Sequence, residues 1–578
     1  MANASIAYIF RMLKVTNMAT CLPNMLRRHV LRRYPMSLGI EWPCICSHRP
    51  STRNYGSRPG GSNRTDESVG RYHEGRNSMS TYESVVEGMR EVAHRTVVVQ
   101  GVDEDQVGRH LQQYGMIESA VQFHRARKSF FMVEYKERTS VANLMVDTGF
   151  SFGEFPVKSR VMFLNQHSIK KRRAPKEDIT SHEHVLSSLK ECKSISDQMD
   201  TLHRCKRLTQ REKRLRFFIA SAIEEALSGI LPHCQIKPFG SCVNGFGWTD
   251  CDLDFTCDIF PPDTQLGRTD MKFISTKQQY ARLSEDQRNR RLLENLSQTL
   301  KSYVPLCSDF QNILKARVPI VRFRHELAGV RCDLSYHDNI THKLSELMFV
   351  YGCYNPDVYP LMSVVKQWAR DKLITRPMPG RYATNFILLA MVVYYMQTQG
   401  LLPTVGAMQT MADTSSEFLN GRESFYFVRD LDSLPKATNT RSLEELLYGF
   451  FSFYTKFNFR HRRISLITGT DFDKTTDSAM QVENPLDITL NVSRSMAPTE
   501  VINLQSEMLN ALRTLDTHRK ADSLEDWGIM CLFSKEDSTQ STTVHTSSLL
   551  DSLQKQTHDF PKTDTDVFLI PQVTTRGV

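Results

Sequence analysis

The middle of the chain alternates between two spacings of apolar residues, one typical of strands and one typical of helices. Short apolar runs bounded by glycine, proline or polar residues predict strands at 236–239, 252–260, 313–318, 320–325 and 330–336. Helical periodicity at 286–304 predicts an amphipathic helix between the second and third of these strands. This mixture of strands with a long helix indicates an α+β domain.

A second alternation covers residues 91–165. The pattern predicts strand 96–99, helix 103–114, strands 117–123 and 129–135, helix 140–148 and strand 157–163. This β-α-β-β-α-β order resembles the RNA-recognition motif (RRM), and Phe130 occupies one of its base-stacking positions. Met132 and Val98 stand where the other two rings are usual. We therefore expect an RRM-like module used mainly for protein contact, including dimerisation, with RNA contact secondary.

Helical periodicity dominates the rest of the chain, from 176 to 230 and from 344 onward. A buried stripe at i, i+3, i+4 and i+7 spacing is formed by Leu361, Val364, Val365 and Trp368. The apolar run at 386–396 is too short to span a bilayer, so we expect a buried helix and no membrane span. The pattern also predicts a helical hairpin with a loop at 404–440 and an amphipathic helix at 443–457.

Composition and charge narrow the function classes. At 578 residues the chain is long enough for two to four domains, and its net charge of +9 favours an anionic partner. The thirteen cysteines are odd in number and lack paired C-x-x-C spacing. They indicate reduced thiols in an intracellular compartment and argue against a disulfide framework.

The ends of the chain differ from the folded part. Residues 1–65 contain ten Lys and Arg but a single acid, Glu41, and apolar residues are interleaved with the basic ones. That pattern favours a mitochondrial presequence at 1–50, with a basic tail that binds nucleic acid as the alternative. Residues 51–90 are expected to be a flexible linker, and 534–578 a disordered tail. A basic run at 170–173 is either a solvated linker or a nuclear signal.

Three carboxylates carry the predicted chemistry. Asp252 and Asp254 are two apart on a predicted strand, so both point to one face and repel each other unless a cation lies between them. Oxygen ligands of this kind suit Mg²⁺. Asp333 stands at the centre of a later strand, and the Gly240-Ser241 turn ahead of Asp252 offers N–H and hydroxyl groups to a phosphate.

Other cations are less informative by spacing alone. Lys366 and Arg370 are four apart on one helix face, which suits a triphosphate and equally suits a solvated face. The helical region at 176–230 has a basic side that contacts either RNA phosphates or solvent. Its cations are Arg204, Lys206, Arg211, Lys213, Arg214 and Arg216.

The order of strand, Gly-Ser turn, D-x-D strand and later strand with a lone Asp resembles the nucleotidyltransferase superfamily of DNA polymerase β and the poly(A) polymerases. A second pattern at 482–493 resembles the nucleotide-recognition loop of poly(A) polymerases and terminal uridylyltransferases. With the RRM-like module and the presequence, the chain is similar to the mitochondrial members of the poly(A) polymerase family. The fold that this implies is a multidomain α+β protein, with a palm of mixed sheet and a helical poly(A) polymerase-associated domain.

The resemblance implies roles for matching positions. Metal carboxylates and catalytic residues would be Asp252, Asp254 and Asp333, and nucleotide contacts would come from Gly240, Ser241, Lys366, Arg370, Thr384, Asn484 and Asp487. Uridylyltransferases of the family often carry a His where this chain has Leu490, so adenylate is favoured. Many relatives read Ser-Ser-Tyr where this chain reads Thr384-Asn385-Phe386, so Phe386 keeps the stacking ring but lacks the hydroxyl.

The predicted function is template-independent addition of AMP from ATP to the 3′ end of RNA in the mitochondrial matrix, with Mg²⁺, or Mn²⁺ as the alternative metal. Two further hypotheses stay open: a uridylyltransferase of the same fold and an inactive RNA-binding adaptor. Intact Gly240, Ser241 and the three aspartates argue against the adaptor. The expected domains are 1–50, 51–90, 91–165, a palm with leading helices at 175–343, a helical domain at 344–533 and the tail at 534–578.

Overall fold

The computed structural model describes most of the chain between residues 81 and 533. Its described stretches are 81–163, 182–259, 283–412, 426–517 and 527–533, with internal gaps at 102–103, 126–127, 148–149, 153–154, 158, 229–230, 232–233, 305, 337–338, 379, 431–432 and 435–440. The predicted presequence, the basic run at 170–173 and the C-terminal tail lie outside the described residues, as does most of the predicted linker.

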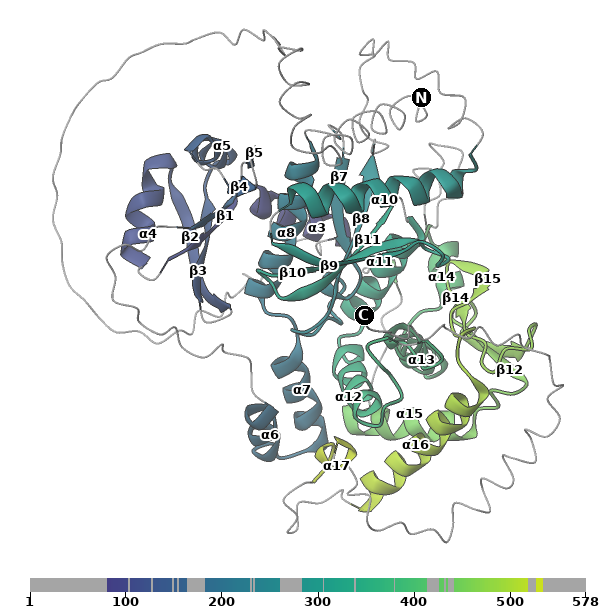
Figure 1. The fold of residues 1–578 in the computed structure, drawn as a ribbon. Helices are drawn as coiled ribbons and strands as arrows, with labels where there is room; N and C mark the ends of the chain where they lie inside the picture. The colour runs from purple at the N-terminus through teal and green to yellow at the C-terminus, as the bar shows by residue number, and fades with distance from the viewer. Residues whose placement is uncertain are drawn as a thin grey trace, which may run out of the picture. The chain divides into compact units, whose positions relative to one another are not determined.

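The chain forms two compact units (Figure 1). One, here called the sheet unit, comprises the described residues up to 163 and those within 208–349 and 429–431. The other, here called the helical unit, comprises the described residues within 182–207, 350–428 and 433–533. The predicted leading helices of the palm therefore divide between the units, because only the part after residue 207 belongs with the sheet.

A five-stranded mixed sheet forms the centre of the sheet unit (Figure 1). Its strands, in spatial order, are β7 (Cys234–Phe239), β8 (Leu253–Ile259), β11 (Val330–Tyr336), β10 (Ile320–His325) and β9 (Cys307–Ile313). Only β8 and β11 run parallel, and the other neighbours are antiparallel. Helices α8 (Gln210–Ser228) and α10 (Glu285–Tyr303) pack against it. The predicted mixed palm sheet and its long helix are confirmed.

One strand of this sheet lies earlier than predicted. The apolar run at 313–318 suggested a strand, whereas β9 ends at Ile313 and the following residues form bends. Strand β9 is the sheet edge and buries little of its surface, so polar residues are tolerated along it. Its low apolar content explains why hydrophobic patterning missed it.

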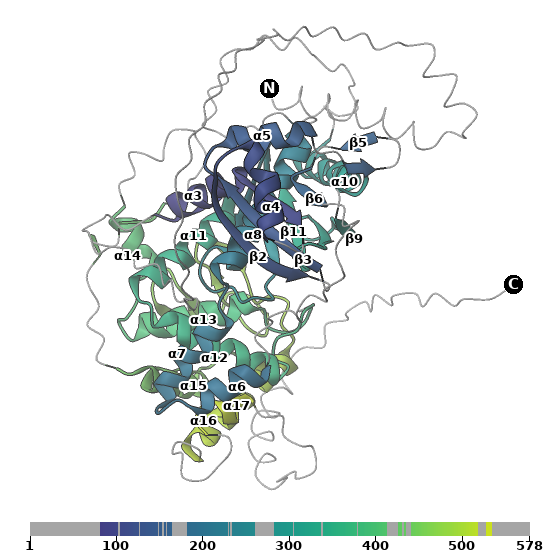
Figure 2. The same cartoon turned by 90° about the vertical axis from the view of Figure 1, so that its left-hand side faces the viewer.

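A four-stranded sheet forms the N-terminal part of the same unit (Figure 2). Its order is β2 (Ile117–Arg125), β3 (Lys128–Tyr135), β1 (Thr96–Gln100) and β6 (Val161–Phe163). Helices α4 (Glu104–Leu111) and α5 (Arg138–Asp147) cover one face through a core that includes Val99 and Phe131. The predicted β-α-β-β-α-β order is observed, except that a small hairpin, β4 (Phe150–Phe152) and β5 (Phe155–Val157), precedes β6.

The opposite face of this sheet is buried by the chain itself. Val98, Phe130 and Met132 belong to one core with α8 and with a further helix, α3 (Tyr82–His94). The prediction of a flexible linker was wrong for residues 82–90, because Thr81 caps α3 and the helix buries Tyr82 and Val86. All three base-stacking positions are therefore inside the protein rather than open to RNA.

The helical unit contains helices and two small hairpins. Its helices include α6 (His182–Lys190), α7 (Ile195–Lys206), α12 (Val358–Asp371), α13 (Asn385–Thr398), α14 (Val405–Thr410), α15 (Leu443–Lys456), α16 (Pro498–Thr517) and α17 (Met530–Phe533). The hairpins are β12 (Arg462–Ser465) with β13 (Thr470–Asp473) and β14 (Glu483–Asn484) with β15 (Asp487–Asn491). Within the described part of 404–440, α14 is the one α-helix, so the predicted hairpin is not seen there.

The prediction placed α6 and α7 with the palm, whereas by contact both helices fall in the helical unit. Gln198 on α7 is buried, donates to the carbonyl of Trp527 (3.3 Å) and accepts from the N–H of Ile529 (2.9 Å). Periodicity identifies the apolar face of a helix but not the element that it packs against, so the sequence does not show this contact. No described helix is both long and apolar enough to cross a membrane, and α13 is instead buried along most of its length.

Candidate active site

The three predicted metal carboxylates come together on neighbouring strands. Asp254 on β8 and Asp333 on β11 are direct partners in the parallel register. Asp252 immediately precedes β8, two residues from Asp254. The strand pairing therefore gathers residues that are about eighty positions apart in sequence, as the pattern predicted.

Two arginines hold the outer carboxylates. Arg322 on β10 donates from Nε and Nη2 to the Oδ1 and Oδ2 atoms of Asp333, at 2.8 and 2.6 Å. Arg331 on β11 donates in the same way to Asp252, at 3.1 and 3.2 Å. Such two-bonded pairs are strong and fix the orientation of both groups. Neither arginine was singled out from the sequence.

The surroundings of Asp254 destabilise the charged form of its carboxylate. Burial, together with the negative charges of Asp333 and Asp252, raises its pKa to about 7, although Arg322 opposes that shift. Burial also raises the pKa of Asp252, although Arg331 opposes that shift. Clustered carboxylates of this kind are stabilised in the charged form when a cation joins them.

The donor set fits a hard divalent metal, but its side chains are not gathered around one point. Among the described residues, no three His, Cys, Asp or Glu side chains are arranged so that they could hold a metal ion. Asp252 and Asp333 are each paired with an arginine. These three carboxylates, two of which have raised pKa values, are oxygen donors of the kind that suits a hard divalent cation.

The Gly240-Ser241 turn lies directly against Asp254. Gly240 begins a short 3₁₀ turn with a φ of +72°, which L-residues adopt with strain. A Cβ at this position would lie 2.9 Å from Oδ2 of Asp254, so only glycine fits without displacing the carboxylate. The N–H of Gly240 donates to the hydroxyl oxygen of Ser345 at 2.8 Å. Gly240 therefore shapes the turn, and its own N–H is engaged within the protein.

An arginine that was predicted on a solvated or RNA-facing surface is instead buried beneath the site. Arg216 on α8 is 2% exposed and donates from Nη2 to the carbonyls of Thr249 and Cys251, both at 3.0 Å. These carbonyls immediately precede Asp252. The signal in the sequence was its position inside the apolar run from Leu215 to Phe218, where a cation needs buried acceptors.

The predicted nucleotide contacts outside the turn all belong to the helical unit. Lys366 on α12 is 8% exposed, whereas Arg370 is exposed in the last turn of the same helix. Thr384 is the N-cap of α13, and its hydroxyl accepts from the N–H of Ile387 at 3.2 Å. The structure thus assigns Thr384 a capping role in addition to any contact with a nucleotide.

Two further predicted contacts lie on the hairpin of β14 and β15. The side-chain oxygen of Asn484 accepts from the N–H groups of Leu486 (2.9 Å) and Asp487 (3.2 Å). Asp487 in turn accepts from the N–H and hydroxyl of Thr489. These bonds define the conformation of the loop, and Leu490 follows on β15 with part of its side chain exposed.

A mixed sheet with carboxylates on two parallel neighbours and a Gly-Ser turn against one of them is the palm of a nucleotidyltransferase. The family profile described as "Poly(A) RNA polymerase, mitochondrial-like, central palm domain" matches residues 195–353. The human protein named "Poly(A) RNA polymerase, mitochondrial" is 30% identical over 503 residues, covering 82% of this chain and 86% of that protein. The Drosophila melanogaster protein of that name is 34% identical over 344 residues, covering 58% and 56%.

Solved structures agree with these similarities. A crystal structure of mtPAP in complex with ATPγS superposes with a TM-score of 0.71 at 28% identity, covering 78% of this chain and 99% of that one. The chain belongs to the mitochondrial poly(A) RNA polymerase family. The prediction of an adenylyl-transferring enzyme is confirmed at this level.

Proposed function

We propose that this chain adds AMP from ATP to the 3′ end of mitochondrial RNA without a template. The observation that carries the proposal is the register that pairs Asp254 with Asp333 and sets Asp252 beside them. The reaction class follows from membership of the family. The site residues would provide the metal ligands and the nucleotide contacts. The three aspartates would hold two Mg²⁺ ions, with Mn²⁺ as the alternative.

When bound, the metal ions lower the pKa of the RNA 3′-hydroxyl and neutralise charge on the leaving pyrophosphate. Asp333 would act on the hydroxyl side, as a ligand and as the proton acceptor. Ser241 would contact the triphosphate through its N–H and hydroxyl, and Lys366 and Arg370 would contact it as cations. Their charge would stabilise the phosphoryl oxygens in the transition state.

The base would be recognised by the helical unit. Thr384 would lie near the nucleotide, and Phe386 would supply a ring for stacking. Because the oxygen of Asn484 already accepts two loop N–H groups, its contact with a base would come from the amide nitrogen. Asp487 would line the same side, and Leu490 would leave uracil without the hydrogen bond that a histidine gives it.

The N-terminal module would serve as an RRM-like scaffold rather than as an RNA reader. Its stacking face is covered by α3 and α8 of the same chain, so a homodimer formed through the module would use another of its surfaces. The presequence would direct the chain to the mitochondrial matrix. Light scattering of the purified chain, and imaging with and without residues 1–50, test these two points.

The decisive experiment is an extension assay with labelled RNA, Mg²⁺ and each nucleoside triphosphate in turn. A long ladder with ATP alone, absent from the Asp252→Ala/Asp254→Ala double variant, is the expected result. Because the related mtPAP has also been crystallised with UTP, CTP and GTP, incorporation rather than binding has to be measured. A ladder with UTP would favour the uridylyltransferase, and RNA binding without extension by either protein would favour the inactive adaptor.

A further inference from the structure

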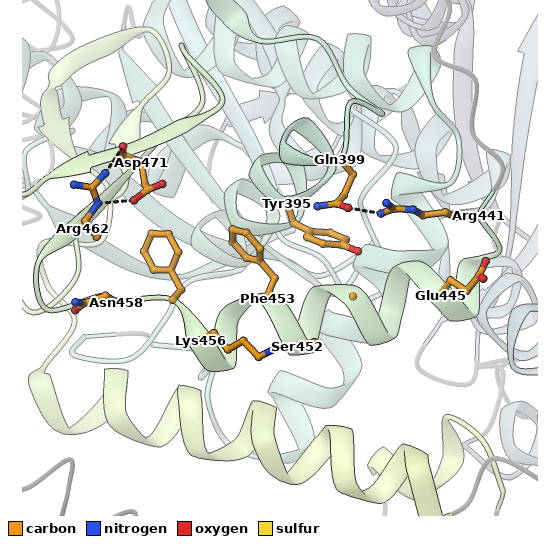
Figure 3. A pocket seen from close by; sticks show the side chains of 12 residues that line it. Tyr395, Gln399, Arg441, Glu445, Ser452, Phe453, Lys456, Asn458, Arg462 and Asp471 are labelled. Carbon is orange, nitrogen blue, oxygen red and sulfur yellow. Dashed lines mark hydrogen bonds and ion pairs between the residues drawn. The ribbon is translucent and has the colours of Figure 1, made fainter.

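A cavity of about 700 Å³ lies within the helical unit, apart from every residue used above (Figure 3). The end of α13, one side of α15 with the residues after it, and the hairpin of β12 and β13 line it. None of its lining residues belongs to the metal, triphosphate or base motifs. The cavity therefore needs an explanation of its own.

Aromatic rings form the middle of the cavity (Figure 3). The ring centroids of Tyr395 and Phe453 are 5.9 Å apart, and those of Phe453 and Phe457 are also 5.9 Å apart. Phe453 and Phe457 are partly exposed there, whereas Phe450 on another side of α15 is fully buried. A Cβ at Gly449 would lie 1.9 Å from the hydroxyl oxygen of Tyr395, so the glycine lets this ring approach the helix.

The charges around the rings favour an anion. The lining carries three cations, Arg441, Lys456 and Arg462, against two carboxylates. Glu445 accepts from the N–H and hydroxyl of Ser442 in a capping box. Arg462 pairs with both Asp471 and Asp473, so the attraction for an anion depends on the charges of Arg441 and Lys456. Arg441 and Lys456 are exposed. Figure 3 shows the Arg441 and Arg462 side chains beyond opposite ends of the ring cluster.

We propose that this cavity binds a nucleotide of the single-stranded RNA substrate other than the one that reacts. A base stacks on the rings, and flanking phosphates contact Arg441 and Lys456, which is how single-stranded nucleic acids bind sequence-tolerant sites. An acidic peptide with an aromatic residue would match the same charges. RNA is favoured because the proposed function, on which this inference rests, brings the nucleic acid to the protein at every turnover.

The test measures binding of a labelled single-stranded oligoadenylate to the full chain, without ATP and without divalent metal. Lys456→Glu should weaken binding about tenfold and lower the slope of log affinity against log salt by about one, because one phosphate contact is lost. Phe453→Leu keeps an apolar side chain of similar size but removes the stacking ring. It should weaken binding about fivefold with the salt slope unchanged.

Arg513→Glu is the matched control. It makes the same change of charge at an exposed position of α16, outside the cavity, and should leave binding close to that of the parent. Thermal melting of all three variants establishes that they are folded. Unchanged binding in both cavity variants, or an equal loss in Arg513→Glu, would overturn the proposal.

A second measurement removes dependence on any one variant. Oligoadenylate carrying a photoreactive base should crosslink to the segment of α15 that contains Phe453, and crosslinks confined to other segments would contradict the inference. The proposed function fails separately: a chain that binds RNA through the cavity but never extends it refutes only the activity. A chain that extends RNA with ATP while both cavity variants bind normally refutes only the cavity.

Discussion

Arg322 and Asp333 are joined by two hydrogen bonds across neighbouring strands, at 2.8 and 2.6 Å. Asp333 is also the strand partner of Asp254, so the arginine neutralises one of the carboxylates that a metal would use. The same is true of Arg331 and Asp252. The two arginines therefore place positive charge directly beside the carboxylate cluster.

Arg322→Gln should increase the affinity for Mg²⁺, because the metal no longer competes with a two-bonded guanidinium. Hydrogen bonds to charged groups contribute about 1.5–3 kcal/mol, and 1.4 kcal/mol corresponds to about tenfold in affinity. The measurement is the Mg²⁺ concentration that gives half of the maximal metal-induced rise in melting temperature. We expect this concentration to be about tenfold lower in the variant than in the parent. Arg324→Gln, on the same strand but bonded away from the aspartates, is the control. Weaker Mg²⁺ binding in Arg322→Gln would contradict this account.

Gly240→Ala should reduce the rate of extension by about a hundredfold, because the new methyl group displaces Asp254 and small misplacements at a reacting centre are costly. It should also destabilise the fold by about 1–2 kcal/mol through its positive φ. Gly400→Ala separates the two effects: its φ is +70°, but its Cβ would contact nothing within 4 Å. We expect that control to lose the same stability and to keep its activity.

Arg216→Met should lower kcat by about a hundredfold at temperatures well below melting. The carbonyls of Thr249 and Cys251 lose their buried donor, and Asp252 follows them directly. The unsatisfied carbonyls should also cost about 2 kcal/mol of stability. Arg214→Met is the control, because Arg214 lies on the same helix but pairs with Glu134. It tests whether the loss of an arginine from α8 is by itself enough to lower kcat. Equal kcat in both variants would exclude a positioning role for Arg216.

Stability should fall as pH decreases from about 6.5 to 4, partly because of His325. This side chain is buried on β10, and burial lowers its pKa to about 4. The unfolded chain takes up a proton near the ordinary pKa of about 6.5 and the folded chain does not, so acid favours unfolding in that window. Denaturant titrations at several pH values measure the free energy of unfolding. Between about pH 6.5 and 4, His325→Leu should lose less of this free energy than the parent, by up to about 3 kcal/mol. His461→Leu, at an exposed site, should keep the slope of the parent.

Leu490→His should raise the use of UTP relative to ATP by about tenfold, the worth of one well-placed hydrogen bond. The ratio of kcat/KM for the two nucleotides is the measurement. Ile488→His places the same side chain two residues earlier on β15, where the native residue is 64% exposed. An equal change in both variants would mean that position 490 has no special role in selecting the base.

The sequence by itself determined the elements and the chemistry of the palm. Strands 320–325 and 330–336 and the long helix that precedes them were predicted closely, because alternation and helical periodicity report directly on burial. The carboxylates at 252, 254 and 333 were also evident. Their spacing fixes the face of the strand to which each one points, which is a local property.

Only the tertiary structure decided which partners these elements meet. Arg322 and Arg331 look like ordinary surface cations in sequence, and the fold turns them toward carboxylates. For Arg216 the apolar neighbours indicate burial, but only the fold identifies the carbonyls that it meets. The same limit applies to helix α7 and to the stacking face of the N-terminal sheet. An apolar pattern shows that a face is buried but not which element packs against it. Strand register and long-range packing arise from the whole chain at once, so spacing along one segment cannot specify them.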